Sequence, residues 1–381
     1  MKQFFSLLSL AVIASTALAQ SNKSIIKCQF DNLPGDSLHV QIAYSSHPDD
    51  MKDEIAYAKK GKYQLEVADD YAVNVMFAEK PKPGQRGYLI DDITRLTVLP
   101  GEKITVKGSV KGKAVIKGSA FEDEQKALDA LTKTQDDEMR RLVEERTAKV
   151  AAGEDEEKVF NDYSKLITAQ QDQKNAIITE YVKSHTDSPL SIYHAAYDMM
   201  DKDQLMQYVT EKGKNGVMKY FIEQMDKYAS RIRESKAKMA ALEKAESAPD
   251  FTAKDLDGND LTLSSLYNKG NYILLDFWGS WCHWCIKALP KMKKVYEAHK
   301  DHFQILSVDC NDTEDRWRKA VAEHELTWLN VKNEQDIDIP GKYGVQGYPT
   351  FVFISPEGKI LKVQTGTDDE FYKYLEDTLS K

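Results

Sequence analysis

The stretch that decides the fold lies between Tyr272 and Cys285 and reads YILLDFWGSWCHWC. Its first six residues form an apolar run, which predicts a buried β-strand over Tyr272–Phe277. After a short loop, a helical pattern runs from Cys282 to His299. A helix N-terminus offers unpaired N–H groups and the positive end of the helix dipole, and both stabilise a thiolate. We therefore expect Cys282 to have a thiol pKa below about 8.5 and to be the attacking sulfur.

The second cysteine of the pair is placed to complete such a reaction. Cys285 lies three residues after Cys282, on the same helix face, and we expect it to be more buried and to resolve a mixed disulfide by attacking Cys282. The chain has 4 cysteines, and a disulfide across a ring of about four residues contributes only about 2 kcal/mol. A disulfide between Cys282 and Cys285 would thus add little stability, and we interpret the pair as a reversible redox disulfide. We expect Cys28 and Cys310 to be separate buried thiols; a disulfide between them is the alternative.

Strand and helix patterns alternate from Pro249 onward, which predicts an α/β sheet covered on both faces. The expected strands after Tyr272–Phe277 are Phe303–Val308, Thr327–Val331, Phe351–Ile354 and an edge strand, Ile360–Gln364. The expected helices are Cys282–His299, Asp312–His324 and Asp369–Leu379.

The part of the chain from Ser24 to Ser119 has a different character. Short β-forming runs with period-two alternation are separated by Asp, Gly and Pro clusters, which is typical of a small antiparallel β-sandwich. These runs are Ser37–Tyr44, Lys62–Val67, Ala72–Phe77, Ile93–Leu99, Ile104–Val110 and Ala114–Ile116. We assign residues 20–119 to this β-sandwich domain, in which we find no catalytic constellation and whose role stays open.

Residues 120–247 predict a helical domain or linker, because strand-like runs give way to a sequence rich in Glu, Lys, Ala and Gln. Asp187-Ser188-Pro189 predicts the cap and first turn of one helix. The first charged helix has two interpretations, a coiled-coil dimerisation arm or the solvated outer face of a bundle helix. We favour the second because the apolar repeat is not sustained. The apolar faces of the first helices comprise Leu128, Leu131, Met139, Leu142, Val159, Phe160, Tyr163, Leu166, Ile167, Ile177 and Ile178.

The first residues, MKQFFSLLSLAVIASTALAQ, have the organisation of a secretory signal peptide. Lys2 precedes an apolar run, and Ala17-Leu18-Ala19 forms a cleavage site. The run is shorter than the about 20 apolar residues that a membrane-anchoring helix needs. Gln20, not a lipid-attachment cysteine, follows the site. We therefore expect a signal peptide over residues 1–19 and an exported, periplasmic protein that is not a lipoprotein.

Length and charge bound the remaining possibilities. A chain of 381 residues is long enough for two or three domains with their own cores. Its 61 acidic and 52 basic residues give a net charge of −9. No protein-wide positive field is available to attract phosphate backbones, so we expect no nucleic-acid partner.

The segment Asp276–Cys285 resembles the active-site segment of the thioredoxin family. Pro290 falls where that family kinks its active-site helix, and Gly347-Tyr348-Pro349-Thr350 resembles the cis-proline loop. Gly366 falls where a glycine closes the last strand. The entry Ala248-Pro249-Asp250-Phe251 is typical of the exported TlpA/ResA-like branch of the AhpC/TSA–thioredoxin superfamily. The resemblance covers residues 248–381 and implies a thioredoxin-like α/β domain in a multidomain α+β protein.

The resemblance also implies roles for individual residues. Asp276 would be a buried carboxylate with a raised pKa that takes the proton from Cys285. Pro349, in the cis form, would hold its loop against Cys282, and the backbone of Tyr348 would hydrogen-bond an extended substrate. Further substrate contacts are expected from Trp281, His283 and Trp284, whereas Trp278 is expected in the core.

Two departures from the family pattern keep alternatives open. The usual proline before the second cysteine is replaced in the dipeptide His283-Trp284, and a histidinium there would push the couple toward oxidising potentials. Ile305 occupies the place where small thioredoxins carry a lysine near the buried acid, so the proton relay on Asp276 is expected to differ. A disulfide oxidase or isomerase, and a non-catalytic interaction protein with a vestigial redox domain, therefore remain alternatives to a reductase.

Two further classes of protein fit the sequence less well. A zinc knuckle needs a second ligand pair, which Cys310, His299 and His302 do not form. A thiol peroxidase would carry Pro and Thr before its cysteine, and the residues before Cys282 lack them.

We expect an exported thiol:disulfide oxidoreductase that reduces protein disulfides without metal, flavin or nucleotide. By resemblance it takes electrons from a membrane thiol transporter, and its substrates are apocytochrome c, as in cytochrome c biogenesis, or a wider set of oxidised proteins.

Overall fold

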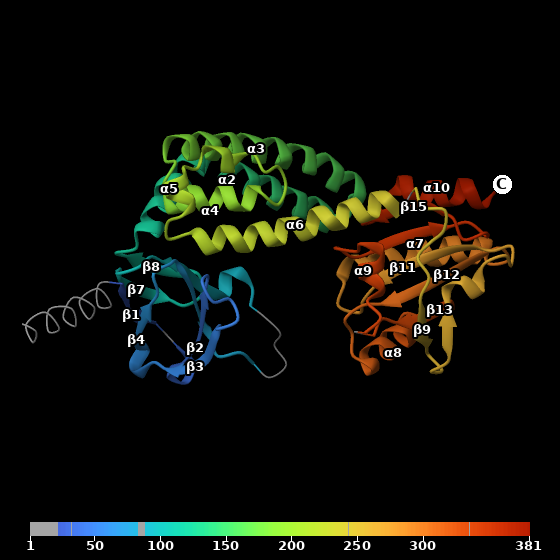
Figure 1. Ribbon diagram of the computed structural model, residues 1–381, viewed down its shortest axis with the longest axis horizontal. Helices are drawn as coiled ribbons and strands as arrows, with labels where there is room; N and C mark the ends of the chain where they lie inside the picture. The colour runs from blue at the N-terminus through green and yellow to red at the C-terminus, as the bar shows by residue number, and fades with distance from the viewer. Residues whose placement is uncertain (1–21, 32, 83–87, 243, 335) are drawn as a thin grey trace, which may run out of the picture. The chain divides into compact units, whose positions relative to one another are not determined.

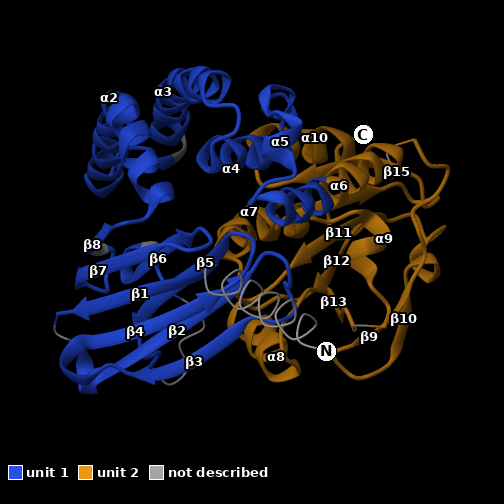
Figure 2. Ribbon diagram, turned by 60° about the vertical axis from the view of Figure 1, so that its left-hand side comes forward, with its two compact units in different colours: residues 1–229 blue, residues 230–381 orange. Residues whose placement is uncertain are grey.

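The computed structural model describes residues 22–381 except 32, 83–87, 243 and 335 (Figure 1). The predicted signal peptide lies outside the described residues. The chain forms two compact units, residues 1–229 and 230–381 (Figure 2). The division falls within one helix, α6 (Lys219–Leu242). The finer domain limits at 119/120 and 247/248 stay a prediction. None of the helices in the described part of the chain has both the length and the apolar character needed to cross a membrane.

The first unit begins with two four-stranded sheets that share one apolar core. Buried side chains from both sheets meet in this core, as in the contact between Phe30 and Phe77, whose ring centroids are 5.4 Å apart. The β-sandwich expected from the sequence is therefore confirmed. One sheet has the order β4-β1-β7-β8, formed by Lys62–Ala68, Lys23–Phe30, Lys103–Ser109 and Lys113–Lys117. The other has the order β3-β2-β5-β6, formed by Lys52–Tyr57, Ser37–Tyr44, Val73–Glu79 and Ile93–Val98.

The sandwich differs from the expectation in its strand pairing and in two strands, β1 and β3, that were not among the expected runs. It is not wholly antiparallel, because β1 pairs with β7 in parallel. Which strands pair depends on how distant segments pack in the shared core, and no local sequence pattern specifies this packing. The strand β3 was not expected either, because it is an edge strand whose side chains are mostly exposed and which lacks an apolar alternation.

The helices of the first unit follow the sandwich. They are α2 (Ala120–Ala151), α3 (Glu156–Ser184), α4 (Pro189–Asp198), α5 (Glu211–Lys214) and the first part of α6. The helices α2 and α3 are antiparallel, with Lys174 paired to Asp136 and Tyr163 to Glu145. The predicted cap of α4 is confirmed, because the Ser188 hydroxyl accepts the N–H of Ser191 and Pro189 occupies the first turn.

The apolar faces predicted for α2 and α3 are only partly buried. Leu128 and Leu142 are buried, but Leu131 is 59% exposed. On α3, Phe160 and Leu166 are also exposed. The two helices touch along a narrow stripe, so an apolar residue one position away from that stripe stays in solvent.

The second unit contains a seven-stranded sheet with the order β10-β9-β13-β12-β11-β14-β15. Parallel pairing joins β11, β12 and β13, and the other pairs are antiparallel. The predicted edge position of β15 is confirmed. In chain order the strands are β9 (Thr252–Asp255), β10 (Asp260–Thr262), β11 (Tyr272–Trp278), β12 (Phe303–Asp309), β13 (Leu329–Lys332), β14 (Thr350–Ile354) and β15 (Ile360–Thr365). The helices are α7 (His283–His299), α8 (Glu314–Glu323), α9 (Ile339–Tyr343) and α10 (Asp369–Leu379).

This sheet has an apolar core on each face. Leu274 and Trp278 of β11 lie in the core that α7, α8 and α10 cover. Ile273, Leu275 and Phe277 lie in the opposite core, with α9 and the end of α6. Because side chains alternate along a strand, Asp276 faces the same side as Leu274, under α7. The expected sheet with helices on both faces is confirmed.

Candidate active site

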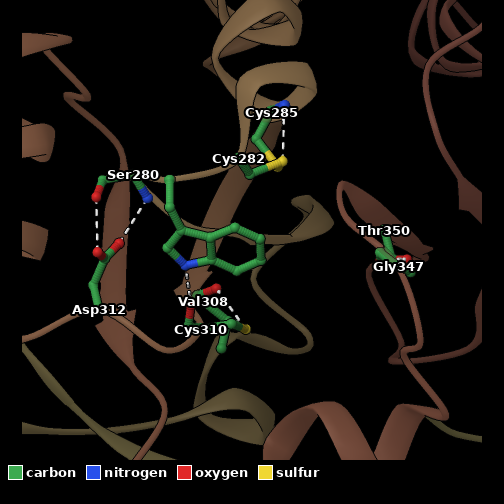
Figure 3. The surroundings of a disulfide bond; sticks show 9 residues. Ser280, Cys282, Cys285, Val308, Cys310, Asp312, Gly347 and Thr350 are labelled. Atoms are coloured by element: carbon green, nitrogen blue, oxygen red, sulfur yellow. Dashed lines mark hydrogen bonds between the residues drawn. A yellow bond between two sulfur atoms is a disulfide. The ribbon is translucent and has the colours of Figure 1, made fainter. Parts of the chain in front are cut away.

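The two cysteines stand at the start of α7 and are joined by a disulfide (Figure 3). Cys282 is the N-cap of the helix, with extended backbone, and its Sγ accepts the N–H of Cys285 at 3.1 Å. The helix thus begins one residue later than expected. Cys282 is 6% exposed and Cys285 is 2% exposed, so the second cysteine is the more buried one. A sulfur at this position lies among the unpaired N–H groups of the first turn, where negative charge is stabilised.

The loop before the disulfide is pinned to the turn that follows β12. The carboxylate of Asp312 accepts the N–H of Ser280 at 2.6 Å and the hydroxyl of Ser280 at 2.7 Å (Figure 3). The indole of Trp281 donates to the carbonyl of Cys310 at 3.0 Å. A side chain on Gly279 would meet the Trp281 ring at 2.5 Å, so the loop packs closely enough to require glycine. Asp312 is a site residue that the sequence analysis did not identify.

Exposed aromatic side chains flank the disulfide. Trp281 is 47% exposed and packs edge-on against Tyr348, with ring centroids 5.3 Å apart. Trp284 is 53% exposed and lies beside His283 and under the ammonium group of Lys287. Trp278 is fully buried in the core, as expected. The structure therefore brings the predicted contact residues Trp281, His283, Trp284 and Tyr348 to the neighbourhood of Cys282.

Asp276 lies on β11 and is 1% exposed. Burial raises the pKa of this carboxyl to about 7, and a hydrogen bond from the Ser307 hydroxyl opposes the shift. The Ser307 hydroxyl donates to the Asp276 Oδ2 atom at 2.8 Å and accepts the indole N–H of Trp328 at 2.8 Å. A group with a pKa near 7 exchanges protons readily at neutral pH.

Ser307 and Trp328 were also missed by the sequence analysis. The comparison with small thioredoxins drew attention to Ile305, which is buried and whose register partner on β11 is Leu274. The register partner of Asp276 is Ser307. A lone hydroxyl in the apolar strand β12 was the available signal, but its partner depended on the register between the two strands.

The loop before β14 carries the predicted proline. The peptide bond between Tyr348 and Pro349 is cis, as expected. The carbonyl of Pro349 accepts the N–H of Gly366, and the Thr350 hydroxyl donates to the carbonyl of Gly347 (Figure 3). The phenol of Tyr348 lies against the thiol of Cys310, and burial raises the pKa of Tyr348 above its usual value. The loop is therefore tied to β15 and to the residues under Trp281.

The other two cysteines are free and buried, as expected. Burial raises the pKa of the Cys28 thiol and of the Cys310 thiol to about 12 each. Neither thiol ionises at neutral pH. Within the described residues, the structure assembles no group of three or more His, Cys, Asp or Glu side chains suited to holding a metal ion.

Comparison with known proteins agrees with this geometry. Residues 245–363 match the AhpC/TSA family. The thiol-disulfide oxidoreductase ResA of Bacillus cereus is 31% identical over 132 residues, which cover 34% of this chain and 75% of the relative. The chain belongs to the ResA family of thiol-disulfide oxidoreductases.

Other members of the ResA family show the same extent of similarity. ResA of Geobacillus thermodenitrificans is 34% identical over 121 residues, covering 32% of this chain and 68% of the relative. The solved thioredoxin domain of a thiol-disulfide oxidoreductase from Bacteroides vulgatus is 35% identical and covers 35% of this chain and 96% of that domain, with a TM-score of 0.33. As a member of the ResA family the protein is a thiol:disulfide oxidoreductase, and its C-terminal part has the thioredoxin-like fold expected from the sequence.

Proposed function

We propose that this ResA-family protein is exported to the periplasm and reduces protein disulfides through Cys282 and Cys285. The observation that carries the proposal is the position of Cys282, which caps α7 beside exposed aromatic side chains while a buried acid faces the same core as Cys285. In the reduced protein these residues would supply an attacking thiolate, a resolving thiol and a proton acceptor.

In the proposed reaction the reduced enzyme supplies two electrons. The Cys282 thiolate attacks one sulfur of a substrate disulfide, so that a mixed disulfide forms and the other substrate sulfur leaves as a thiolate. Cys285 then gives its proton toward Asp276 and attacks the Cys282 sulfur. The bond between enzyme and substrate breaks, the second substrate thiol is released, and the Cys282–Cys285 disulfide remains. A thiol-based electron donor at the membrane would return two electrons to the enzyme.

The surface around Cys282 suits an extended polypeptide. Trp281 and Trp284 offer apolar area, and His283 is exposed between the two cysteines. In this proposal the backbone of Tyr348, next to the cis-proline Pro349, hydrogen-bonds a substrate strand. We infer that the substrates are oxidised proteins, with apocytochrome c as one candidate.

We infer the reducing direction from the charge of a buried carboxylate near the two cysteines. An ionised carboxylate near a dithiol disfavours the thiolate form, destabilises the reduced state and makes the couple more reducing. Asp276, with a pKa of about 7, is the group that would act in this way. A positive charge on His283 and the helix N-terminus act in the opposite sense and favour an oxidase or isomerase.

One experiment decides the direction. The purified protein is equilibrated with glutathione and with dithiothreitol, and the reduced fraction of Cys282 is measured. We expect a reduction potential of about −270 mV, whereas a value of about −120 mV would indicate an oxidase.

Reduction of insulin disulfides by the wild type and by Cys282→Ser tests catalysis itself, because equal rates would mean a non-catalytic domain. Edman sequencing of exported protein tests cleavage after Ala19.

A further inference from the structure

A second buried acid lies near the active-site loop. Asp309 ends β12 and is fully buried, and neither of its carboxyl oxygens has a hydrogen bond of normal geometry to any described residue. In the parallel register it stands next to Trp278, the last residue of β11 before the active-site loop. A buried carboxylate without hydrogen bonds is strongly unfavourable, so Asp309 is expected to carry a proton.

The surroundings of Asp309 link it to the loop. Asp312 interacts directly with the carboxyl group of Asp309 and uses both of its own oxygens to hold the N–H and hydroxyl of Ser280. The Lys332 ammonium donates to the main-chain carbonyl of Asp312 at 2.7 Å and lies 4.0 Å from the Asp309 carboxyl. Ser280 stands two residues before Cys282. The acid pair thus lies directly behind the residues that present the attacking sulfur.

We propose that Asp309 and Asp312 act as a positioning pair for Cys282. The proton on Asp309 lets Asp312 keep both hydrogen bonds to Ser280. Loss of that proton sets two carboxylates against each other, weakens the hold on Ser280 and adds a negative charge behind the loop. This role rests on the dithiol exchange proposed above and adds to it a dependence of Cys282 reactivity on the state of Asp309.

The charges that face Asp309 determine where it titrates. Burial, together with the close approach and negative charge of the Asp312 carboxyl, raises its pKa to about 8, and the ammonium of Lys332 on β13 opposes the shift. Cys310, next in the chain, and Tyr348, from the loop before β14, both have pKa values raised above their usual range and are neutral near pH 8. Asp276 binds a different partner and titrates near 7. The two acids can therefore be separated by their variants.

The test follows alkylation of Cys282 by iodoacetamide in the reduced full-length protein between pH 5 and 10, with the modified cysteine identified by mass spectrometry. We expect an inflection near pH 8 in the wild type that is absent in Asp309→Asn. At pH 9 the variant should react about threefold faster, because its Asp312 keeps both hydrogen bonds to Ser280; the factor is about that expected for losing one such bond. At pH 6 the two proteins should react alike, because Asp309 is then protonated.

Variants of Ser280 and Asp312 test whether this pair of acids positions Cys282. Ser280→Ala removes one of the two hydrogen bonds and should lower the rate about threefold at all pH values, and Asp312→Asn about tenfold. Because the acids act as a pair, Asp309→Asn should add little when combined with Asp312→Asn. Asp315→Asn makes the same chemical change at an exposed position on α8 and should leave the profile unchanged. Should Asp312→Asn fail to fold, Ser280→Ala still provides the test.

Other results of these experiments would contradict the proposed role of Asp309 and Asp312. An unchanged inflection in Asp309→Asn would overturn the assignment to Asp309. Unchanged alkylation rates and an unchanged reduction potential in Ser280→Ala and Asp312→Asn would reduce the pair to a structural role. For comparison, a tenfold change in the dithiol–disulfide equilibrium corresponds to about 30 mV. If wild-type Cys282 reacts like an ordinary thiol and insulin is not reduced, the proposed function itself fails.

Discussion

The hydroxyl of Ser307 donates a hydrogen bond to the Asp276 Oδ2 atom at 2.8 Å, between register partners on the parallel strands β12 and β11. The same hydroxyl accepts the indole N–H of Trp328, so its proton is directed at the carboxylate. A hydrogen bond to the charged form stabilises that form. Ser307 therefore limits how far burial can raise the pKa of the acid that we propose as the proton acceptor for Cys285.

Ser307→Ala should move the titration of Asp276 upward. A hydrogen bond to a charged group contributes about 1.5–3 kcal/mol, so we expect a shift of about one pKa unit. The measurement is the pH dependence of insulin reduction, in which the inflection near pH 7 should move toward 8 and disappear in Asp276→Asn. Ser355→Ala, which removes another buried hydroxyl of the same unit, is the control and should keep the wild-type profile.

Asp276 should also make the second unit more stable in mild acid. Between about pH 4 and 7 the folded protein holds a proton on Asp276 that the unfolded chain releases, so the free energy of unfolding falls as pH rises through this window. The loss is on the order of 4 kcal/mol for a shift of about three pKa units. Asp309 contributes in the same sense up to about pH 8, so the comparison of wild type with Asp276→Asn isolates the first acid.

Tryptophan fluorescence during urea unfolding of the oxidised protein measures this effect. All 5 tryptophans lie in the second unit, so the signal reports on that unit alone. We expect a smaller pH slope for Asp276→Asn than for the wild type. Equal slopes in both proteins would show that Asp276 does not hold the proton.

Trp284→Ala should weaken substrate binding and leave the chemistry intact. The side chain is 53% exposed, so its removal uncovers no core, but it takes away apolar area beside Cys282. Loss of a peripheral aromatic contact of about 1 kcal/mol predicts a KM for protein disulfides about fivefold higher, with alkylation of Cys282 by a small reagent unchanged. Tyr228→Ala, an exposed aromatic residue of the first unit, should change neither quantity. An unchanged KM in Trp284→Ala would remove this residue from the substrate surface.

His194 should make the first unit sensitive to acid, in the opposite direction to Asp276. Burial lowers the pKa of this α4 imidazole to about 4, with a smaller contribution from Lys174, so the unfolded chain binds a proton that the folded state does not. The unfolding free energy should fall by about 2–3 kcal/mol as pH drops from about 6.5 to 4. Circular dichroism at 222 nm follows the helices, and His194→Gln should flatten this dependence. A wild-type stability of the first unit that is constant over this range would contradict the assignment.

Local sequence patterns sufficed for much of the architecture. The helix α10 spans the predicted residues Asp369–Leu379, and the strand β2 spans the predicted Ser37–Tyr44. The cap at Ser188 and the edge position of β15 were also predictable, because helix caps and the alternation of apolar residues depend on neighbouring residues in the sequence. The Cys282–Cys285 pair and its place at a helix start belong to the same class, whereas the buried acid Asp276 was expected from the resemblance to the thioredoxin family.

Only the tertiary structure decided which distant residues meet. The parallel pairing of β1 with β7, the exposure of Leu131, and the contacts of Ser307 with Asp276 and of Asp312 with Ser280 depend on register and on close approach of separate segments. A one-residue change of register reverses the face of every side chain in a strand, and no local pattern specifies that register. The amino-acid sequence thus determined most of the elements and the Cys282–Cys285 pair at the start of α7, while packing between elements determined which hydrogen bonds and charges surround that pair.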